Sequence, residues 1–228
     1  MSYLSDFIAL FYPNYCLSCN NSLIKGEKCL CLQCLAKLPK TDFHLQKDNP
    51  VEMLFGGRVP IFRATAFYFF HKEGIIQHLI HQLKYKGRRE IGNYLGLLFG
   101  LALLESEDFQ SIDIILPIPL HPHKRKKRGY NQSEFICGGI AKGMKKEYNY
   151  NLLVRTMDTK TQTKKSRYNR WENVSQIFKV LQPEKLEGKH ILLVDDVVTT
   201  GATLEATVQA LLEVPNTKIS IACLACAY

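Results

Sequence analysis

One stretch of the sequence indicates the fold class: Ile191-Leu192-Leu193-Val194-Asp195-Asp196-Val197-Val198-Thr199-Thr200-Gly201-Ala202-Thr203. Its apolar start predicts a buried strand, and the alanine-rich pattern from Leu204 onward predicts a helix. Two carboxylates and a short threonine/glycine loop lie between them. Loop amides and a helix amino end attract phosphate, while Asp195 and Asp196 can accept hydrogen bonds from vicinal hydroxyls or reach a hydrated divalent ion. The stretch therefore predicts a sugar-phosphate site in an α/β protein.

The same stretch resembles the phosphoribosyl diphosphate (PRPP) motif of the type I phosphoribosyltransferases at every position. The resemblance implies a parallel sheet flanked by helices, with ribose hydroxyls on Asp195 and Asp196. It also implies that the 5′-phosphate lies on the loop formed by Thr199, Thr200, Gly201, Ala202 and Thr203. The alternative is an ordinary strand-loop-helix of an open α/β sheet whose acidic tip binds a metal ion or nothing.

Composition limits the partners without choosing among them. Lys plus Arg outnumber Asp plus Glu by 30 to 21 over 228 residues, which gives a formal charge of +9. Such a charge favours phosphorylated small molecules, nucleic acid or an acidic membrane surface. No run is long and apolar enough to span a bilayer, and the first residues lack the basic start and cleavage site of a signal peptide. We therefore expect a cytoplasmic protein without membrane insertion.

Five of the eight cysteines crowd into the first 34 residues. Cys16 and Cys19 form one C-x-x-C pair, and Cys31 and Cys34 form another after an eleven-residue spacer. Four thiolates at this spacing can converge on one tetrahedral Zn²⁺ with no open position, so we predict a structural zinc site. Cys29 is a surplus thiol that could replace Cys31, although only Cys31 completes the second pair. The alternative is a set of buried cysteines without metal.

A first basic run, from Lys84 to Arg89, ends a helical pattern that begins near Gly74. Cations near a helix carboxyl end are often merely solvated, because they complement the helix dipole there. The other interpretation places Lys84 in the site, and we take it as a candidate catalytic residue.

A second basic run, Lys124 to Arg128, lies in a loop between a predicted strand over 112–118 and a helix that Asn131 can cap. A charge run is usually a solvated surface. This one follows the carboxyl end of a strand, where parallel sheets place ligands. Arg128, as a candidate catalytic residue, and the backbone around Gly129, Tyr130 and Asn131 suit a pyrophosphate, which needs several donors.

We divide the chain near residue 60. Residues 1–60 form the zinc module and a linker or loose crossover from Lys37 to Pro60, and residues 61–228 form the phosphoribosyltransferase-like domain. Strands are predicted over 63–71, 112–118 and 219–227, with a helix from Gln132 to about Tyr148. The polar, basic segment 155–171 is either a disordered surface loop or a mobile lid that excludes water during catalysis.

Taken together, these motifs resemble the ComF family (competence protein F), whose members are phosphoribosyltransferase-like proteins with an N-terminal four-cysteine zinc module. The resemblance covers nearly the whole chain. It rests on the four cysteines of the module, Leu83-Lys84-Tyr85-Lys86-Gly87, Pro117-Ile118-Pro119-Leu120-His121-Pro122, Arg128-Gly129-Tyr130-Asn131-Gln132, Gln162, Ser166, Arg170, Asn173, Phe178 and the PRPP motif. It implies a link to the handling of single-stranded DNA during natural transformation.

Three functions remain open from the sequence. The first is a phosphoribosyltransferase that transfers the phosphoribosyl group of Mg²⁺-bound PRPP to a nitrogen nucleophile. The second is a single-stranded DNA-handling protein with a vestigial or regulatory PRPP site, which the cations and the aromatics Tyr85, Tyr130, Tyr168 and Trp171 would suit. The third is a metal-dependent phosphatase-like domain that uses the same acids.

Overall fold

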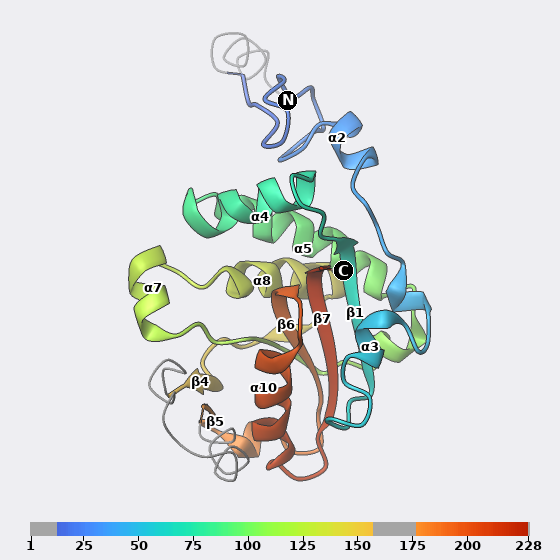
Figure 1. The fold of residues 1–228 in the computed structure, drawn as a ribbon, viewed down its shortest axis with the longest axis vertical. Helices are drawn as coiled ribbons and strands as arrows, with labels where there is room; N and C mark the ends of the chain where they lie inside the picture. The colour runs from blue at the N-terminus through green and yellow to red at the C-terminus, as the bar shows by residue number, and fades with distance from the viewer. Residues whose placement is uncertain (1–12, 157–176, 228) are drawn as a thin grey trace.

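A computed structural model describes residues 13–156 and 177–227 (Figure 1). Its centre is a five-stranded parallel sheet in the order β1-β7-β6-β2-β3. The strands are β1 (Arg63–Phe69), β2 (Ile114–Pro117), β3 (Glu147–Tyr148), β6 (His190–Val198) and β7 (Lys218–Cys226). In the central strands nearly every side chain is buried, as expected of a sheet covered on both faces. The predicted α/β fold with a parallel sheet flanked by helices is confirmed.

Helices cover both faces of this sheet (Figure 1). One face carries α4 (Ile75–Tyr85), α5 (Arg89–Leu103) and α8 (Gln132–Met144), and the other carries α3 (Pro50–Met53) and α10 (Ala202–Leu212). Helices α5 and α8 pack with backbones almost in contact, because a Cβ atom on Gly139 would lie 2.4 Å from the carbonyl oxygen of Asn93. This packing fixes the amino end of α8, which reaches the candidate site.

The basic run expected as a loop is a helix, α7 (Pro122–Arg128). Pro122 occupies the first turn, where a missing amide hydrogen does no harm. The Nδ1 atom of His121 accepts a hydrogen bond from the His123 amide at 3.2 Å. Gly129 ends the helix in the left-handed conformation at φ 80°. These caps explain a helix that the charge pattern alone did not indicate.

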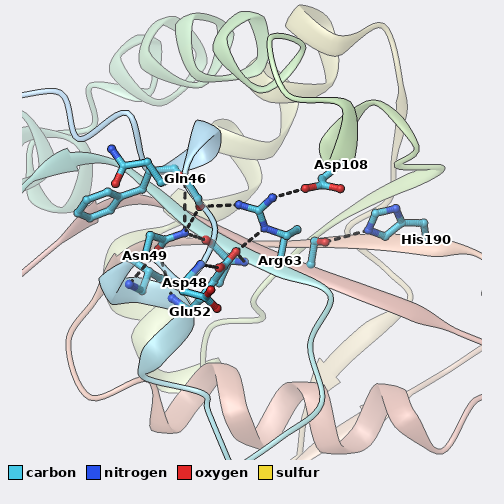
Figure 2. A network of polar contacts seen from close by, with 11 residues as sticks. Gln46, Asp48, Asn49, Glu52, Arg63, Asp108 and His190 are labelled. Atoms are coloured by element: carbon cyan, nitrogen blue, oxygen red, sulfur yellow. Dashed lines mark hydrogen bonds and ion pairs between the residues drawn. The ribbon is translucent and has the colours of Figure 1, made fainter.

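The segment expected as a linker is folded against the sheet. It contains the short helix η1 (Phe43–Leu45) and α3. The Asn49 side chain caps α3 and also donates from Nδ2 to the Ala64 carbonyl at 2.9 Å. Buried Arg63 forms ion pairs with Glu52 and Asp108 (Figure 2). The expected loose crossover is therefore wrong, because a polar network ties this segment to β1, while the division near residue 60 stays a prediction.

The cysteine-rich end of the chain includes α2 (Leu32–Ala36) and lies beyond α4, away from the body of the sheet (Figure 1). The side chain of Gln82 on α4 donates to the Leu17 carbonyl at 2.5 Å and so connects the two parts. None of the helices in residues 13–156 and 177–227 has the length and apolar character needed to cross a membrane.

The remaining elements are short. They are α6 (Glu107–Gln110), η4 (Pro183–Lys185) and an antiparallel pair made by β4 (Leu153–Arg155) and β5 (Phe178–Val180). Helix α8 ends at Met144, a few residues before the predicted end, where Lys145 adopts a left-handed conformation. Most of the predicted lid, together with Gln162, Ser166, Tyr168, Arg170, Trp171 and Asn173, lies outside the described residues.

Candidate functional site

Three segments that are distant in sequence meet at the carboxyl edge of the sheet. They are the end of α4, the junction between α7 and α8, and the acidic end of β6. The Nζ atom of Lys84 lies 2.9 Å from Oδ1 of Asp196, and both side chains are largely buried. The second oxygen of Asp196, Oδ2, is buried and has no hydrogen-bond partner within the described parts of the chain. A buried carboxylate oxygen without a donor is unfavourable, so this oxygen suits a ligand hydroxyl or cation.

Asp195 is held from two sides. Its Oδ1 accepts a hydrogen bond from the Ser133 hydroxyl at 3.1 Å and another from the Asp196 amide at 2.9 Å. Burial, and then the charge of Asp196, raises the pKa of Asp195 to about 7. The Ser133 bond and the cation of Lys84 act in the opposite direction. Two acids at one strand end thus share a site that favours an added cation or hydrogen-bond donor.

The loop that follows β6 is open on one side. A small cavity of about 60 Å³ is lined by Asp195 and by every residue from Val197 to Leu204. Gly201 has φ 74°, a conformation that favours glycine, and a Cβ atom there would lie 3.0 Å from the Phe55 ring, a tight contact. Arg58 donates to the Thr200 carbonyl at 3.0 Å and pairs with Glu205 on α10. The predicted phosphate loop therefore has a defined shape.

Arg128 lies in the last turn of α7 and is fixed by two neighbours. It donates to Gln132 Oε1 at 2.9 Å and to the Tyr85 hydroxyl at 3.3 Å, with its guanidinium 5.1 Å from the centre of the Tyr85 ring. Tyr85 directly follows Lys84. The two candidate catalytic residues are therefore brought to the same end of α4. Lys84 contacts the acidic pair, and Arg128 contacts Tyr85.

Tyr130 and Asn131 use their side chains within the protein. The Tyr130 hydroxyl donates to the Leu83 carbonyl, and the ring lies under the guanidinium of Arg89 at 4.7 Å. Asn131 caps α8 and donates from Nδ2 to the Ile118 carbonyl at 2.9 Å. Together with Gly129, these residues can therefore offer a ligand their backbone, whereas their side chains fix the junction in place.

Four cysteine sulfurs gather in the N-terminal module. The ligand atoms of Cys16, Cys19, Cys31 and Cys34 all lie within 4.8 Å of one another, and the Cys19 and Cys31 sulfurs are 3.7 Å apart. Zinc–sulfur bonds of about 2.3 Å in a tetrahedron place sulfurs roughly 3.8 Å apart. The Cys29 thiol instead contacts the Glu90 carbonyl at 3.6 Å. The predicted ligand set can hold zinc, and Cys29 is not part of it.

Three residues that contact the candidate site were not predicted from the sequence. Ser133 reaches Asp195, Arg58 holds the predicted phosphate loop, and Gln132 fixes Arg128. Gln132 ends the motif that begins at Arg128, but no sequence pattern indicates that the two side chains bond to each other. Arg58 lies in the supposed linker, where nothing in the local sequence signals a contact across 142 positions. Helix position alone would point to Ser133, because it lies two residues after the cap residue Asn131, at the end of α8 nearest the site.

A second, larger cavity lies between the cysteine module and helices α4 and α5. Its volume is about 890 Å³, and its lining includes Tyr15, Lys28, His78, Lys86 and Arg88. Helix α4 thus separates this basic cavity from the acidic pair, since Lys84 and Lys86 point to different sites.

Comparison with known proteins agrees with this geometry. The model of the phosphoribosyl transferase domain matches residues 144–227. The DNA utilization protein YhgH of Escherichia coli (strain K12) is 31% identical over 226 residues, which cover 95% of this chain and 92% of the relative. Competence protein ComFC of Bacillus subtilis (strain 168) is 26% identical over 84% of this chain and 81% of its own.

Among solved structures, a glutamine PRPP amidotransferase from B. subtilis aligns with a TM-score of 0.45 and 18% identity. The alignment covers 63% of this chain and 30% of that enzyme. Sheet, site and domain match together define a type I phosphoribosyltransferase-like protein with an N-terminal four-cysteine module. Within that class, the chain belongs to the ComF family, as its full-length likeness to the DNA utilization and competence proteins shows.

Proposed function

We propose that this protein binds PRPP together with Mg²⁺ and transfers its phosphoribosyl group to a nitrogen nucleophile, with release of pyrophosphate. The observation that carries the proposal is the buried, unpartnered Oδ2 of Asp196 beside the open loop that ends at Thr203. A phosphate on the loop would accept hydrogen bonds from the backbone amides of the loop. A ribose diol within reach of the strand end would donate hydrogen bonds to Asp195 and Asp196.

The reaction proposed here exchanges one bond for another at the anomeric carbon. The bond from that carbon to the pyrophosphate oxygen breaks, the nitrogen lone pair forms the new bond, and the nitrogen loses its proton to water. Mg²⁺, when bound, neutralises charge on the leaving pyrophosphate. Arg128 would add a fixed cation on the same group, because Tyr85 and Gln132 hold its guanidinium before any ligand arrives.

Calorimetric titration with PRPP and Mg²⁺ tests the binding step. We expect saturable binding to the natural protein and a loss of at least about tenfold in affinity with Asp196→Asn, a change worth roughly 1.4 kcal/mol. The matched control is Glu213→Gln, which removes an exposed acid at the far end of α10. Absence of binding to the natural protein, or equal binding to Asp196→Asn, contradicts the proposal. Release of pyrophosphate upon addition of candidate acceptors then tests transfer.

The basic cavity beside the cysteine module favours a second candidate function, the binding of single-stranded DNA. Lys28, Lys86 and Arg88 supply cations there and Tyr15 supplies an aromatic ring, a combination that suits a nucleic-acid strand. The names of the relatives refer to DNA utilization and competence, which supports this candidate. A reducing cytoplasm, which keeps the cysteine thiolates available for zinc, is part of both proposals.

The dependence of affinity on salt concentration distinguishes binding of a DNA strand in this cavity from binding of a small anion. Binding of a fluorescent oligonucleotide should weaken steeply between low and physiological salt, and Lys86→Glu should lower both the affinity and the salt slope. Lys145→Glu, which reverses an exposed cation after α8, is the matched control. Flat salt dependence, or equal effects of the two reversals, contradicts DNA binding in this cavity.

A further inference from the structure

The predicted phosphate loop after β6 is supported by a turn that is distant from it in the sequence. This turn, from Leu54 to Arg58, follows α3. Its Phe55 side chain is completely buried and belongs to the same core cluster as Val198 and Leu204, which lie before and after the loop. A Cβ atom on Gly201 would lie 3.0 Å from the Phe55 ring. The turn therefore packs directly against the middle of the loop.

The guanidinium of Arg58 adds polar contacts to this packing. Its Nη1 atom donates to the Leu54 carbonyl and to the Thr200 carbonyl, each at 3.0 Å. Its Nη2 atom pairs with Glu205 in the first turn of α10. A planar guanidinium can donate to several acceptors at fixed angles, whereas a lysine ammonium is a single point charge on a flexible stem. The Thr200 carbonyl is therefore held in one direction by a side chain that is bonded to its own turn.

A carbonyl that is held in one direction also orients the amide that follows it. No cis peptide bond occurs among the described residues, so the carbonyl of Thr200 and the amide hydrogen of Gly201 point in opposite directions. The Gly201 amide consequently points away from Arg58. The small cavity at the loop is lined by Asp195 and by the residues from Val197 to Leu204. Arg58 thus contacts the loop from outside that cavity.

The ion pair of Arg58 also balances an acid at the amino end of α10. The backbone amide of Glu205 donates to the Gly201 carbonyl at 2.8 Å, so this acid lies within one turn of the loop. A carboxylate there favours the helix dipole but repels an anion at the same helix end. The side chains of Arg58 and Glu205 are 39% and 23% exposed, and an ion pair of this exposure adds little to stability. Its loss should therefore affect the loop more than the fold.

We propose that Arg58 is a positioning residue for a phosphate on this loop. It holds the peptide between Thr200 and Gly201 so that the Gly201 amide faces the cavity, and it balances the charge of Glu205. The inference rests on the proposed function, because the phosphate concerned is the 5′-phosphate of PRPP. Arg58 acts through the loop and does not touch the ligand. The segment before residue 60 thereby contributes to a site whose proposed ligand contacts lie after that residue.

A set of full-length variants separates the two parts of this role. Arg58→Met removes the bond to the Thr200 carbonyl together with the ion pair, and Glu205→Gln removes only the charge of the acid. The double variant lacks the carbonyl bond but carries no unbalanced carboxylate. Arg58→Lys keeps the cation without the planar fork. The control is Lys185→Met, which removes an exposed cation in η4.

Two measurements are made on each variant. Calorimetry with ribose 5-phosphate, and with PRPP and Mg²⁺, gives the affinity at low and at physiological salt. Nitrogen-15 relaxation of the amides from Thr199 to Thr203 gives the order of the loop in the ligand-free protein. Thermal unfolding shows that each variant is folded at the temperature of both measurements.

We expect Arg58→Met to weaken binding of both ligands by roughly tenfold, as loss of one hydrogen bond to a charged group predicts. The loop amides should become less ordered in that variant, while Glu205→Gln and Lys185→Met should keep both loop order and affinity. The double variant should remain at least about threefold weaker than Glu205→Gln at both salt concentrations, because salt screens a charge but does not restore an orientation. Arg58→Lys should recover only the part that depends on charge.

Three results overturn the inference alone: binding that Arg58→Met leaves unchanged, full recovery of affinity in the double variant, or loop order that does not depend on Arg58. In each of these cases the natural protein still binds both ligands, so the proposed function stands. If the natural protein binds neither ligand, the proposed function falls, and the assignment of Arg58 to a phosphate falls with it.

Discussion

Lys84 and Asp196 lie 112 residues apart in the chain, and their side chains meet at 2.9 Å where α4 reaches the end of β6. The ammonium balances one oxygen of a nearly buried carboxylate and leaves the other oxygen without a partner. The pair thus prepares the carboxylate for a ligand and at the same time joins two elements of the fold. Its removal should therefore affect both stability and binding.

Substitution Lys84→Met should destabilise the protein by about 2 kcal/mol, because it leaves a buried charge without its partner. It should also weaken PRPP binding, since the cation no longer orients Asp196. Urea unfolding and calorimetry measure the two effects. Lys86→Met, two positions along and exposed, is the control and should change stability by less than about 0.5 kcal/mol. Equal stabilities of the two variants would contradict a structural role for the pair.

The acidic pair should make the ligand-free protein less stable at alkaline pH. The pKa of Asp195 is raised to about 7 in the folded chain, mainly by burial, against an ordinary value of 3.8. The folded state therefore binds more protons between those values, and this part of the stability is complete below pH 4 and is lost as the pH rises through 7. Asp195→Asn should remove that loss and raise the unfolding free energy at pH 8 by about 2 kcal/mol.

Thermal unfolding at pH 5 and pH 8, with and without PRPP, checks the Asp195 prediction. The stabilising effect of Asp195→Asn should be larger at pH 8, and the same variant should bind PRPP weakly. Glu213→Gln should show neither effect. A pH profile of Asp195→Asn that runs parallel to that of the natural protein would contradict the raised pKa.

Much of this site follows from local sequence, and its remaining parts depend on packing. The run that ends at Thr203 predicts a strand, an acidic tip and a loop before a helix, and the structure has each of them, with Asp195 and Asp196 within β6 rather than beyond it. Phosphate binding by that loop stays a prediction. The spacing of the cysteines likewise indicates the four possible metal ligands, Cys16, Cys19, Cys31 and Cys34. Contacts such as Arg58 with Thr200 join residues that no periodicity relates, so they require the folded chain.

The predictions from sequence that are wrong lie in segments where a single feature of composition dominates. Five consecutive cations ending at Arg128 predict a loop. The segment is a helix instead, because Pro122 favours its first turn and His121 and Gly129 cap its two ends. The residues before Pro60 have glycines and mixed charge, which are typical of a linker. Glu52 nevertheless pairs with Arg63, and this long-range partner turns an apparently loose segment into part of the sheet's support.

A buried histidine at the other end of the sheet predicts acid sensitivity. Burial, and then Lys218, lowers the pKa of His190 to about 4, and its ring nitrogens lie 2.8 Å from the hydroxyl oxygens of Ser111 and Ser220. The unfolded chain therefore binds more protons between pH 6.5 and 4, so stability should fall as the pH drops through that range. His190→Gln should reduce the fall by about 2 kcal/mol, as measured by urea unfolding at pH 4.5 and 7.5.

The matched control for the acid prediction is His78→Gln. His78 is exposed on α4, and the variant should keep the acid-induced fall in stability that His190 causes. The His190 variant is expected to be less stable than the natural protein at neutral pH, because glutamine does not reproduce both serine contacts. Identical pH profiles for the natural protein and His190→Gln would show that this ring does not cause the acid sensitivity.

The cysteine module should contain one zinc ion per chain. Because the four sulfurs lie within 4.8 Å of one another, Cys31→Ser should lose the metal and expose the module to proteolysis. Cys29→Ser should retain it, since the Cys29 sulfur contacts the Glu90 carbonyl instead. Elemental analysis of purified protein and limited proteolysis check both statements. Equal metal loss in the two variants would return Cys29 to the ligand set.

Two adjacent glycines on α8 should respond oppositely to alanine. A Cβ atom at Gly139 would lie 2.4 Å from the Asn93 carbonyl oxygen and 2.7 Å from the Leu97 amide, and these backbone atoms belong to the neighbouring helix. At Gly138 the nearest atom would be 3.6 Å away. Gly139→Ala should therefore force α5 and α8 apart and destabilise the protein by about 3 kcal/mol, whereas Gly138→Ala should stabilise it by up to about 1 kcal/mol through helix propensity.

The same glycine pair connects packing with the site. Ser133 lies in the first turn of α8, the helix in which Gly139 packs against α5, and its hydroxyl donates to Asp195 Oδ1 at 3.1 Å. Displacement of α8 should therefore lengthen that bond and weaken PRPP binding in Gly139→Ala beyond what the lower folded fraction explains. Titration at a temperature where both variants are fully folded separates the two effects. Unchanged affinity in folded Gly139→Ala would mean that the position of Asp195 is set by β6 alone.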